Sequence, residues 1–337
     1  MLKKAKRLAV LTGCLSLSLV CFAYGEEPEH ETLVIDLDNP CGVLVHPETG
    51  KVYTASKLGV HCYTPADHKA VFEVSEFPED IYGKGPKYDI GPLGLGLLNN
   101  EHLVVGDGSR PDGEELVRVY KLDGKKKSEG DAVYTLGPIT AGEKSAKGEG
   151  NFYGVAVNES AIFVTCNGDD TKGWVSKADI VDGKPQELVP FIATKEATGT
   201  DAPVAITFTP DGSELVIGQM GEMNVANDSL LTFYDPGTGE LKRSLKTELS
   251  DIAGLAYSPQ TGKLYAVDFS WVDSTKGGLF ELAVDGETVN ATKIMSLDKP
   301  TSLAFDKEGQ LYLTQFGSEV PEGAESAGSL IRVEPGL

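Results

Sequence analysis

Polar side chains close the second strand of each of six repeated hairpins that the sequence predicts. They recur every 47–60 residues, as Ser56, Asp107, Asn167, Gln219, Asp268 and Gln315. All six carry an oxygen atom, and such oxygens are the ligands that a hard cation such as calcium prefers. Asp107 and Asp268 supply the carboxylates, so they are the predicted metal ligands of a weak site, with Asn167, Gln219 and Gln315 nearby. The alternative is a water-filled opening that these polar side chains line.

The motifs of several common enzyme classes do not occur in the sequence. It contains no Gly-x-Ser-x-Gly nucleophile motif, no His-Glu-x-x-His pair, no Cys-x-x-Cys pair and no Gly-Lys-Ser/Thr phosphate loop. The five histidines all precede residue 103, so two-thirds of the chain offers no histidine as a general base. The sequence therefore identifies no catalytic residues.

Three of the connections that leave the polar residues are long and span 106–115, 218–229 and 315–328. Long loops on a rigid scaffold are where binding residues commonly lie. The loops on this side, which we name the long-loop face, carry acidic and large apolar residues: Asp112, Glu114, Glu115, Asp169, Asp170, Glu222, Met223, Phe269, Trp271, Asp273, Phe316, Glu319 and Glu322. We expect a ligand or partner to bind on this face. In the alternative interpretation, the aromatic side chains only pack the loops together.

The elements that must position these residues are β-hairpins. In the stretch 201–219, apolar residues alternate on both sides of the turn Pro210-Asp-Gly, which is typical of two antiparallel strands. Similar hairpins recur, and a small residue occupies the same place in the first strand of each: Gly42, Gly94, Gly154, Ala205, Gly254 and Ser302. Small residues are expected where strands pack close to a crowded axis.

Each hairpin is followed by a further pair of strands. Four strands with a period near 50 residues are typical of a β-propeller blade. Six such units fill residues 26–337, so we predict one all-β domain, a six-bladed β-propeller with four-stranded antiparallel blades. The sixth unit has only three strands of its own, so Thr32–Leu37 is expected to pair with Ser329–Val333. Closing the ring with this N-terminal strand would remove exposed strand edges.

The first 25 residues are predicted to be a secretory signal peptide. Lys3, Lys4, Lys6 and Arg7 precede an apolar run, and cleavage is expected near Gly25. A lipoprotein site at Cys14 is a minor alternative. The mature protein would be periplasmic or extracellular. No later apolar stretch is long enough for a transmembrane segment.

The charge of the chain narrows the choice of partners. The net charge is −21, and removal of the four basic residues of the signal peptide would make it −25. Such a chain repels nucleic acid and anionic membranes, so neither is an expected partner. An unknown small molecule, a cation or a basic protein remains as a possible partner. In the alternative interpretation, the acidic residues only form a solvated surface and bind no partner.

Three of the five cysteines would remain after cleavage: Cys41, Cys62 and Cys166. An odd number does not suit a disulfide framework. Cys41 and Cys62 are expected on the first and third strands of one blade, about 9–10 Å apart at the usual strand spacing. That separation exceeds what a disulfide allows, so we predict that they are not bonded to each other.

The strand patterns resemble those of the NHL and gluconolactonase-like six-bladed propellers. Phe152-Tyr-Gly-Val-Ala-Val, 210–219 and 328–335 are similar to the exported propellers of scytonemin biosynthesis clusters. The resemblance implies export and a non-catalytic or undefined role. Gluconolactonases hold calcium or zinc with a glutamate at the start of an innermost strand. None of the matching positions here is acidic: Cys41, Leu93, Phe152, Val204, Ile252 and Thr301.

The sequence therefore predicts an exported binding or scaffold module that holds a ligand or partner on the long-loop face. The alternative is a calcium-dependent hydrolase of the lactonase type, with its site at the mouth of the channel. The expected cofactor is none, or calcium.

Overall fold

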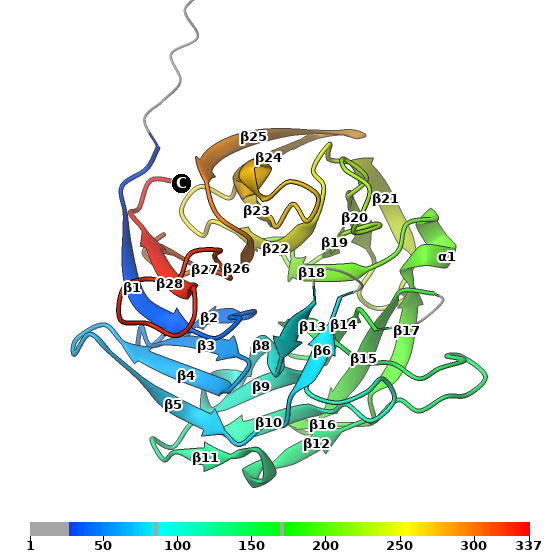
Figure 1. The fold of residues 1–337 in the computed structure, drawn as a ribbon. Coiled ribbons are helices and arrows are strands. Elements are labelled where there is room, and N and C mark those ends of the chain that lie inside the picture. Colours follow the sequence, from blue (N-terminus) through cyan, green and yellow to red (C-terminus); the bar gives the residue numbers. More distant parts are fainter. Residues whose placement is uncertain (1–26, 84–86, 169–171) are drawn as a thin grey trace, which may run out of the picture.

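The computed structural model describes residues 27–83, 87–168 and 172–337. The chain forms six antiparallel blades around a central axis, and the single α-helix of the described residues, α1 (Thr194–Thr198), is short (Figure 1). The predicted six-bladed β-propeller is therefore confirmed. No helix in the described ranges is long and apolar enough to cross a membrane.

In blades 1 to 5, the four main strands follow one another along the chain from the axis outward. Blades 1 to 3 contain β2 (Val43–Val45), β3 (Val52–Ser56), β4 (Gly59–Thr64) and β5 (Lys69–Ser75); β8 (Pro92–Leu98), β9 (His102–Asp107), β10 (Val117–Lys121) and β12 (Tyr134–Leu136); and β13 (Phe152–Val157), β14 (Ala161–Cys166), β15 (Trp174–Val181) and β17 (Val189–Ala193). Blades 4 and 5 contain β18 (Pro203–Phe208), β19 (Leu215–Gln219), β20 (Leu230–Tyr234) and β21 (Leu241–Lys246), then β22 (Ile252–Tyr257), β23 (Leu264–Asp268), β24 (Gly278–Asp285) and β25 (Thr288–Ser296).

Blade 6 joins the two ends of the chain. Its own strands are β26 (Pro300–Phe305), β27 (Leu311–Gln315) and β28 (Gly328–Val333), and β1 (His30–Leu37) is the fourth. β1 runs beside β28 in Figure 1, with Thr32 opposite Ile331 and Leu37 opposite Gly328 in the register of the pair. The predicted closure by the N-terminal strand is confirmed, and it leaves no unpaired edge on β28.

Four short strands lie outside the four main strands of the blades. β11 (Lys127–Ser128) pairs in parallel with β5 and so ties a loop of blade 2 to the outer edge of blade 1. β16 (Lys184–Pro185) extends a hairpin from β15. β6 (Asp80–Tyr82) and β7 (Tyr88–Ile90) form a separate hairpin in the segment of the chain that connects blade 1 to blade 2.

The innermost strands pack closely, as the small residues predict. A Cβ atom on Gly42 would lie 2.3 Å from the carbonyl oxygen of Leu93 in the next blade. One on Gly94 would lie 2.4 Å from the carbonyl oxygen of Tyr153, again one blade further. A larger side chain at either place would push neighbouring blades apart.

The buried core lies between the faces of neighbouring blades. Phe163 of blade 3, for example, is fully buried and packs its ring edge against Phe208 of blade 4, with the centroids 5.8 Å apart. Cys41 and Cys62 are buried and not bonded to each other, as predicted. Burial of each large apolar side chain contributes about 1.5–3 kcal/mol, which makes these contacts the main stabilising term.

Candidate functional site

The register of the strands divides the predicted polar residues into two groups. Asp107, Gln219, Asp268 and Gln315 each lie opposite the first residue of the innermost strand of their blade. In blade 3 the residue in this position is Cys166, which lies opposite Phe152. Asn167 follows this position by one residue. Because side chains alternate along a strand, the Asn167 side chain points to the opposite side from that of Cys166.

Asn167 reaches the axis. Its amide nitrogen donates a 2.7 Å hydrogen bond to the Tyr82 hydroxyl oxygen, and it lines a small cavity on the axis. The other four predicted residues do not line this cavity. The structure thus brings one of the five candidate ligand-binding residues to the channel.

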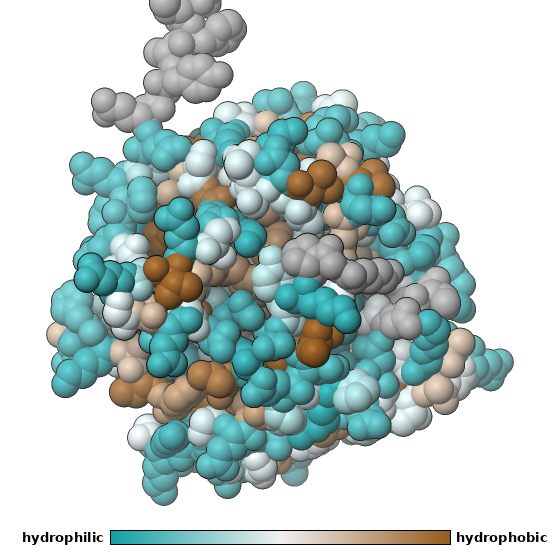
Figure 2. Space-filling view, viewed as in Figure 1, coloured by the Kyte–Doolittle hydropathy of each residue, from teal (hydrophilic) through white to brown (hydrophobic). Residues whose placement is uncertain are grey.

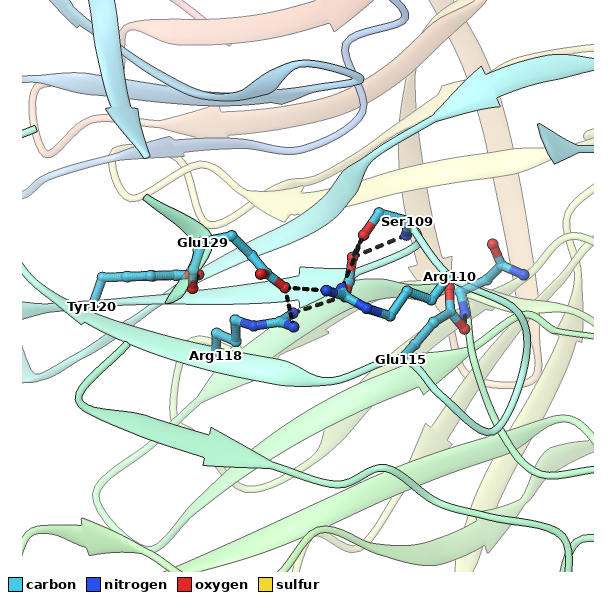
Figure 3. Close-up of polar contacts among 8 residues, drawn as sticks. Ser109, Arg110, Glu115, Arg118, Tyr120 and Glu129 are labelled. Atoms are coloured by element: carbon cyan, nitrogen blue, oxygen red, sulfur yellow. Dashed lines mark hydrogen bonds and ion pairs between the residues drawn. The ribbon is translucent and has the colours of Figure 1, made fainter. Parts of the chain in front are cut away.

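Asp107 is fully buried and belongs to an ion-pair network inside blade 2, of which Arg110, Arg118 and Glu129 are labelled in Figure 3. Its Oδ2 atom lies 2.8 Å from a guanidinium nitrogen of Arg118 and 2.7 Å from one of Arg110. Both arginines also pair with Glu129, and the backbone N–H of Ser109 donates to the Asp107 carboxylate at 2.9 Å. This carboxylate holds together the loop that leaves β9.

Asp268 performs a similar task in blade 5 through backbone groups. It accepts hydrogen bonds from the N–H groups of Ser250, Asp251 and Ser270, at 3.1, 2.8 and 3.1 Å. Burial nevertheless raises the pKa of the Asp268 carboxyl.

Gln219 and Gln315 complete the predicted set. Gln219 is buried and donates to the Thr200 carbonyl oxygen at 2.5 Å. Gln315 is half-buried at the end of β27. Gln219 thus fixes the segment that leads into its own blade, as Asp268 does in blade 5, whereas Asp107 fixes the loop that follows its strand.

Calcium binding by Asp107 and Asp268 stays a prediction. The two residues belong to blades 2 and 5, and within the described ranges no three His, Cys, Asp or Glu side chains are grouped to hold a metal ion. If calcium binds the folded protein, a hundredfold excess over Kd should add about 2.7 kcal/mol to the free energy of unfolding. Thermal unfolding with and without millimolar calcium tests this. A gain that Asp268→Asn reduces would support a ligand role, and an equal gain in the variant would exclude one.

The mouth of the channel on the long-loop face is covered by the β6–β7 hairpin, which crosses the centre of the ring in Figure 1. Tyr88 of this hairpin packs against Phe316 and Trp271, with ring centroids 5.0 and 5.2 Å away. Trp271 in turn packs against Phe269 at 4.7 Å. The cavity beneath has a volume of about 30 Å³, which suffices for one or two water molecules. The aromatic side chains therefore seal this end of the channel.

The sequence analysis missed this hairpin. The stretch between Ile81 and Tyr88 contains two glycines and a proline, which are turn signals, and tyrosines flank it. That pattern could have identified two short strands. Nothing in it indicated that they would fold over the axis.

Exposed apolar side chains lie on the connections of the long-loop face. They are Leu58, Ile81, Val225, Val272 and Val320, which are 44–58% exposed and come from five different connections of the long-loop face. Ile81 and Val272 adjoin the cavity-lining residues Tyr82 and Trp271, while Val320 and Val225 follow Phe316 and Met220 within five residues. Figure 2, drawn from the side on which β6 lies over the centre, shows separate apolar side chains among hydrophilic ones.

Acidic side chains lie on the same loops as these apolar residues. Glu222, Glu319 and Glu322 are exposed on the same loops. At the hairpin, Lys57 lies 3.2 Å from Asp89 and 3.1 Å from Glu79, which joins the Leu58 turn to the β6–β7 hairpin. The face therefore combines apolar contacts with negative charge.

Two carboxyl groups beneath the loops are fully buried. Glu115 accepts a 2.6 Å hydrogen bond from the Asn151 N–H, and burial, together with Asp112 and Asp107, raises its pKa to about 10. Asp251 accepts from the Trp271 N–H at 2.7 Å, and burial raises its pKa to about 7. Both groups anchor loops and contribute to the pH dependence of stability.

Comparison with known proteins supports the fold and leaves the activity open. No known family profile and no curated protein matches the sequence. A gluconolactonase from Xanthomonas campestris is similar over 91% of this chain and 89% of its own, with a TM-score of 0.60 and 14% identity. A luciferin-regenerating enzyme is similar over 92% and 96%, with a TM-score of 0.59 and 14% identity. A glucose dehydrogenase is similar over 92% and 100%, with a TM-score of 0.61 and 14% identity.

Identities this low show a shared fold alone. The three structures have this fold in common but are named as three different enzymes. The predicted likeness to gluconolactonases is supported at the level of the fold. The chain has the architecture of the gluconolactonase-like six-bladed β-propellers.

Proposed function

We propose that the protein is a binding module whose long-loop face engages a basic, amphipathic segment of a partner protein. The observation that carries the proposal is the set of five exposed apolar side chains on the connections of the long-loop face, which also carry exposed carboxylates. The five side chains lie apart among hydrophilic ones, so the proposed contact consists of separate apolar anchors within a negatively charged surface.

The chemistry of the face selects the partner. Apolar side chains of the partner would bury Val225, Val272 and Val320, and each fully buried residue of this kind contributes about 1.5–3 kcal/mol. Lysine or arginine side chains would meet the carboxylates of Glu222, Glu319 and Glu322. The net charge of −21 would speed the approach of a basic partner and oppose anionic ones.

A lysine- and leucine-rich amphipathic peptide with a fluorescent label serves as the probe. Val272→Asn and Val320→Asn should each weaken its binding about tenfold, because a contact of about 1.4 kcal/mol is lost. Val71→Asn on the outermost main strand β5 and Val181→Asn at the end of β15 alter similarly exposed valines and should not change the affinity. Equal affinities of all four variants would contradict the proposal.

The charge of the face is tested by salt. Glu319→Gln combined with Glu322→Gln should weaken binding at low salt and flatten its salt dependence, because screened charges contribute less. Glu287→Gln combined with Glu159→Gln, in the exposed turns between β24 and β25 and between β13 and β14, removes the same number of charges and is the matched control. The same salt dependence in both variants would assign the attraction to the net charge of the chain instead.

The calcium-dependent lactonase is the alternative function, and the likeness to a gluconolactonase is what favours it. Against it, the six positions that match the gluconolactonase glutamate are buried and none is acidic. The resemblance to NHL repeats and to the exported propellers of scytonemin clusters supports a non-catalytic role and rests on sequence pattern. A lactonase assay with calcium tests the alternative directly.

Export is part of the proposal and rests on the sequence. The predicted signal peptide, with the minor alternative at Cys14, lies outside the described residues. N-terminal sequencing of the protein from its host should begin at Glu26, and a chain that begins at Met1 would contradict export.

A further inference from the structure

The opposite end of the channel is open and forms a second cavity, which is larger than the one beneath the β6–β7 hairpin. Its volume is about 510 Å³, and all six innermost strands contribute to its wall. Tyr153 lies at its inner end, where its hydroxyl group donates a 3.1 Å hydrogen bond to the Thr301 carbonyl oxygen. Because Tyr153 belongs to blade 3 and Thr301 to blade 6, this side chain crosses the axis and separates the cavity from the sealed mouth.

The wall of this cavity is mostly apolar. Each innermost strand supplies at least one such side chain: Leu44, Leu95, Val155, Ile206, Leu255 and Leu303. Phe208, Tyr257 and Phe305 lie near its outer end and are half-buried. Among the described residues of the wall, the charged ones are Asp306 and Lys307, which lie beside the turn that follows β26, at the entrance.

Hydrogen-bonding groups of the backbone complete the wall. Each innermost strand pairs with only one other strand, so one of its edges faces the axis. Some of these peptide groups are already paired, as the Val43 N–H is with the Ser302 hydroxyl oxygen at 3.4 Å. A cavity of 300–1,000 Å³ with apolar walls and a few polar groups is typical of small-molecule sites.

We propose that this cavity binds a largely apolar, uncharged small molecule that enters beside Lys307. The apolar side chains would supply the affinity, and the peptide edges would hydrogen-bond one or two polar atoms of the ligand. A charged ligand does not suit the inner part of the wall, because a buried charge without a partner is costly. The site is separate from the long-loop face, so it does not depend on the proposed protein partner.

The neutral fluorophore N-phenyl-1-naphthylamine is the probe. Its emission should rise saturably on titration with the wild-type protein. Thr207→Trp places a large ring in the half-exposed wall position at the end of β18, and it should weaken binding at least tenfold. Thr292→Trp adds the same volume on the exposed outer strand β25 and should bind like the wild type.

A second variant guards against misfolding of the first. Lys307→Trp changes an exposed turn residue, which leaves the fold intact, and should also weaken binding because it narrows the entrance. Val272→Asn, on the other face, should leave the affinity unchanged. The proposal is overturned if the wild type shows no saturable binding, if both tryptophan variants of the cavity bind like the wild type, or if Val272→Asn abolishes binding.

Discussion

Replacement of Arg118 by methionine should lower the free energy of unfolding by about 3 kcal/mol, at the lower end of what removal of one partner of a buried ion pair costs. The side chains of Arg118 and Asp107 are 6% and 0% exposed. Without Arg118, the Asp107 carboxylate keeps Arg110 and Ser109 as its partners among the described residues. The loss of stability stays at this lower end because Arg110, 2.7 Å from Asp107, still pairs with the carboxylate. Urea unfolding measures the change.

Two further variants separate charge from packing. Arg332 pairs with Glu31 at 2.8 Å near the surface, so Arg332→Met should cost less than about 1 kcal/mol. Adding Asp107→Asn to Arg118→Met should recover part of the loss, because no uncompensated charge then remains. Equal losses for Arg118→Met and Arg332→Met would show that the network of blade 2 is no more important than a surface pair.

The stability of the protein should fall as the pH rises from 5 to 8, and Glu115 should cause much of the fall. Burial raises the pKa of this carboxyl from 4.5 to about 10 in the folded state. Between these values, the folded protein keeps a proton that the unfolded chain releases. The free energy of unfolding therefore decreases with pH, by at most about 1.4 kcal/mol per pH unit for one group.

Glu115→Gln removes the titrating group and should flatten this dependence. Asp251, with its pKa raised to about 7, acts in the same direction but is present in both proteins. Asp211→Asn is the control, because hydrogen bonds from Thr209 and Ser213 lower the pKa of exposed Asp211 to about 2. Its contribution is lost only as the pH falls below 3.8 toward that value. Above pH 5 its curve should parallel the wild type, and a parallel curve for Glu115→Gln would show that Glu115 is ionised when folded.

The fold could be predicted because each blade repeats the same local signals. Alternating apolar residues around Pro210-Asp-Gly define one hairpin, and the small residue at Gly42 or Gly94 marks the crowded axis. The absence of a fourth strand in the last unit identified β1 as its partner. These are short-range patterns, so a single sequence contains them.

The site could be predicted only in part, because it depends on contacts between distant residues. The long-loop face was identified from loop lengths, and Trp271 and Phe316 do pack around the mouth of the channel. The one-residue offset that turns Asn167 toward Tyr82 cannot be read from the spacing of the repeats. Lys127 shows the same limit: it lies in a run of lysines, yet it is buried and pairs with Glu73 of blade 1 at 3.2 Å.

The two proposed sites lie at opposite ends of the propeller axis. Tyr153 and the aromatic side chains under the β6–β7 hairpin close the channel from the long-loop face. A protein on that face and a small molecule in the open cavity would therefore not compete for the same residues. Binding of either probe should leave the affinity for the other unchanged.

Hydrogen–deuterium exchange with the lysine- and leucine-rich peptide bound tests the central claim most directly, because it locates the peptide on the protein. The account predicts protection in 220–229, 269–277 and 316–327, which carry Val225, Val272 and Val320 on the long-loop face. The turns at 209–214, 258–263 and 306–310, at the opposite end of the channel, should exchange as in the free protein. Protection confined to those turns, or spread evenly over the outer strands, would contradict the account.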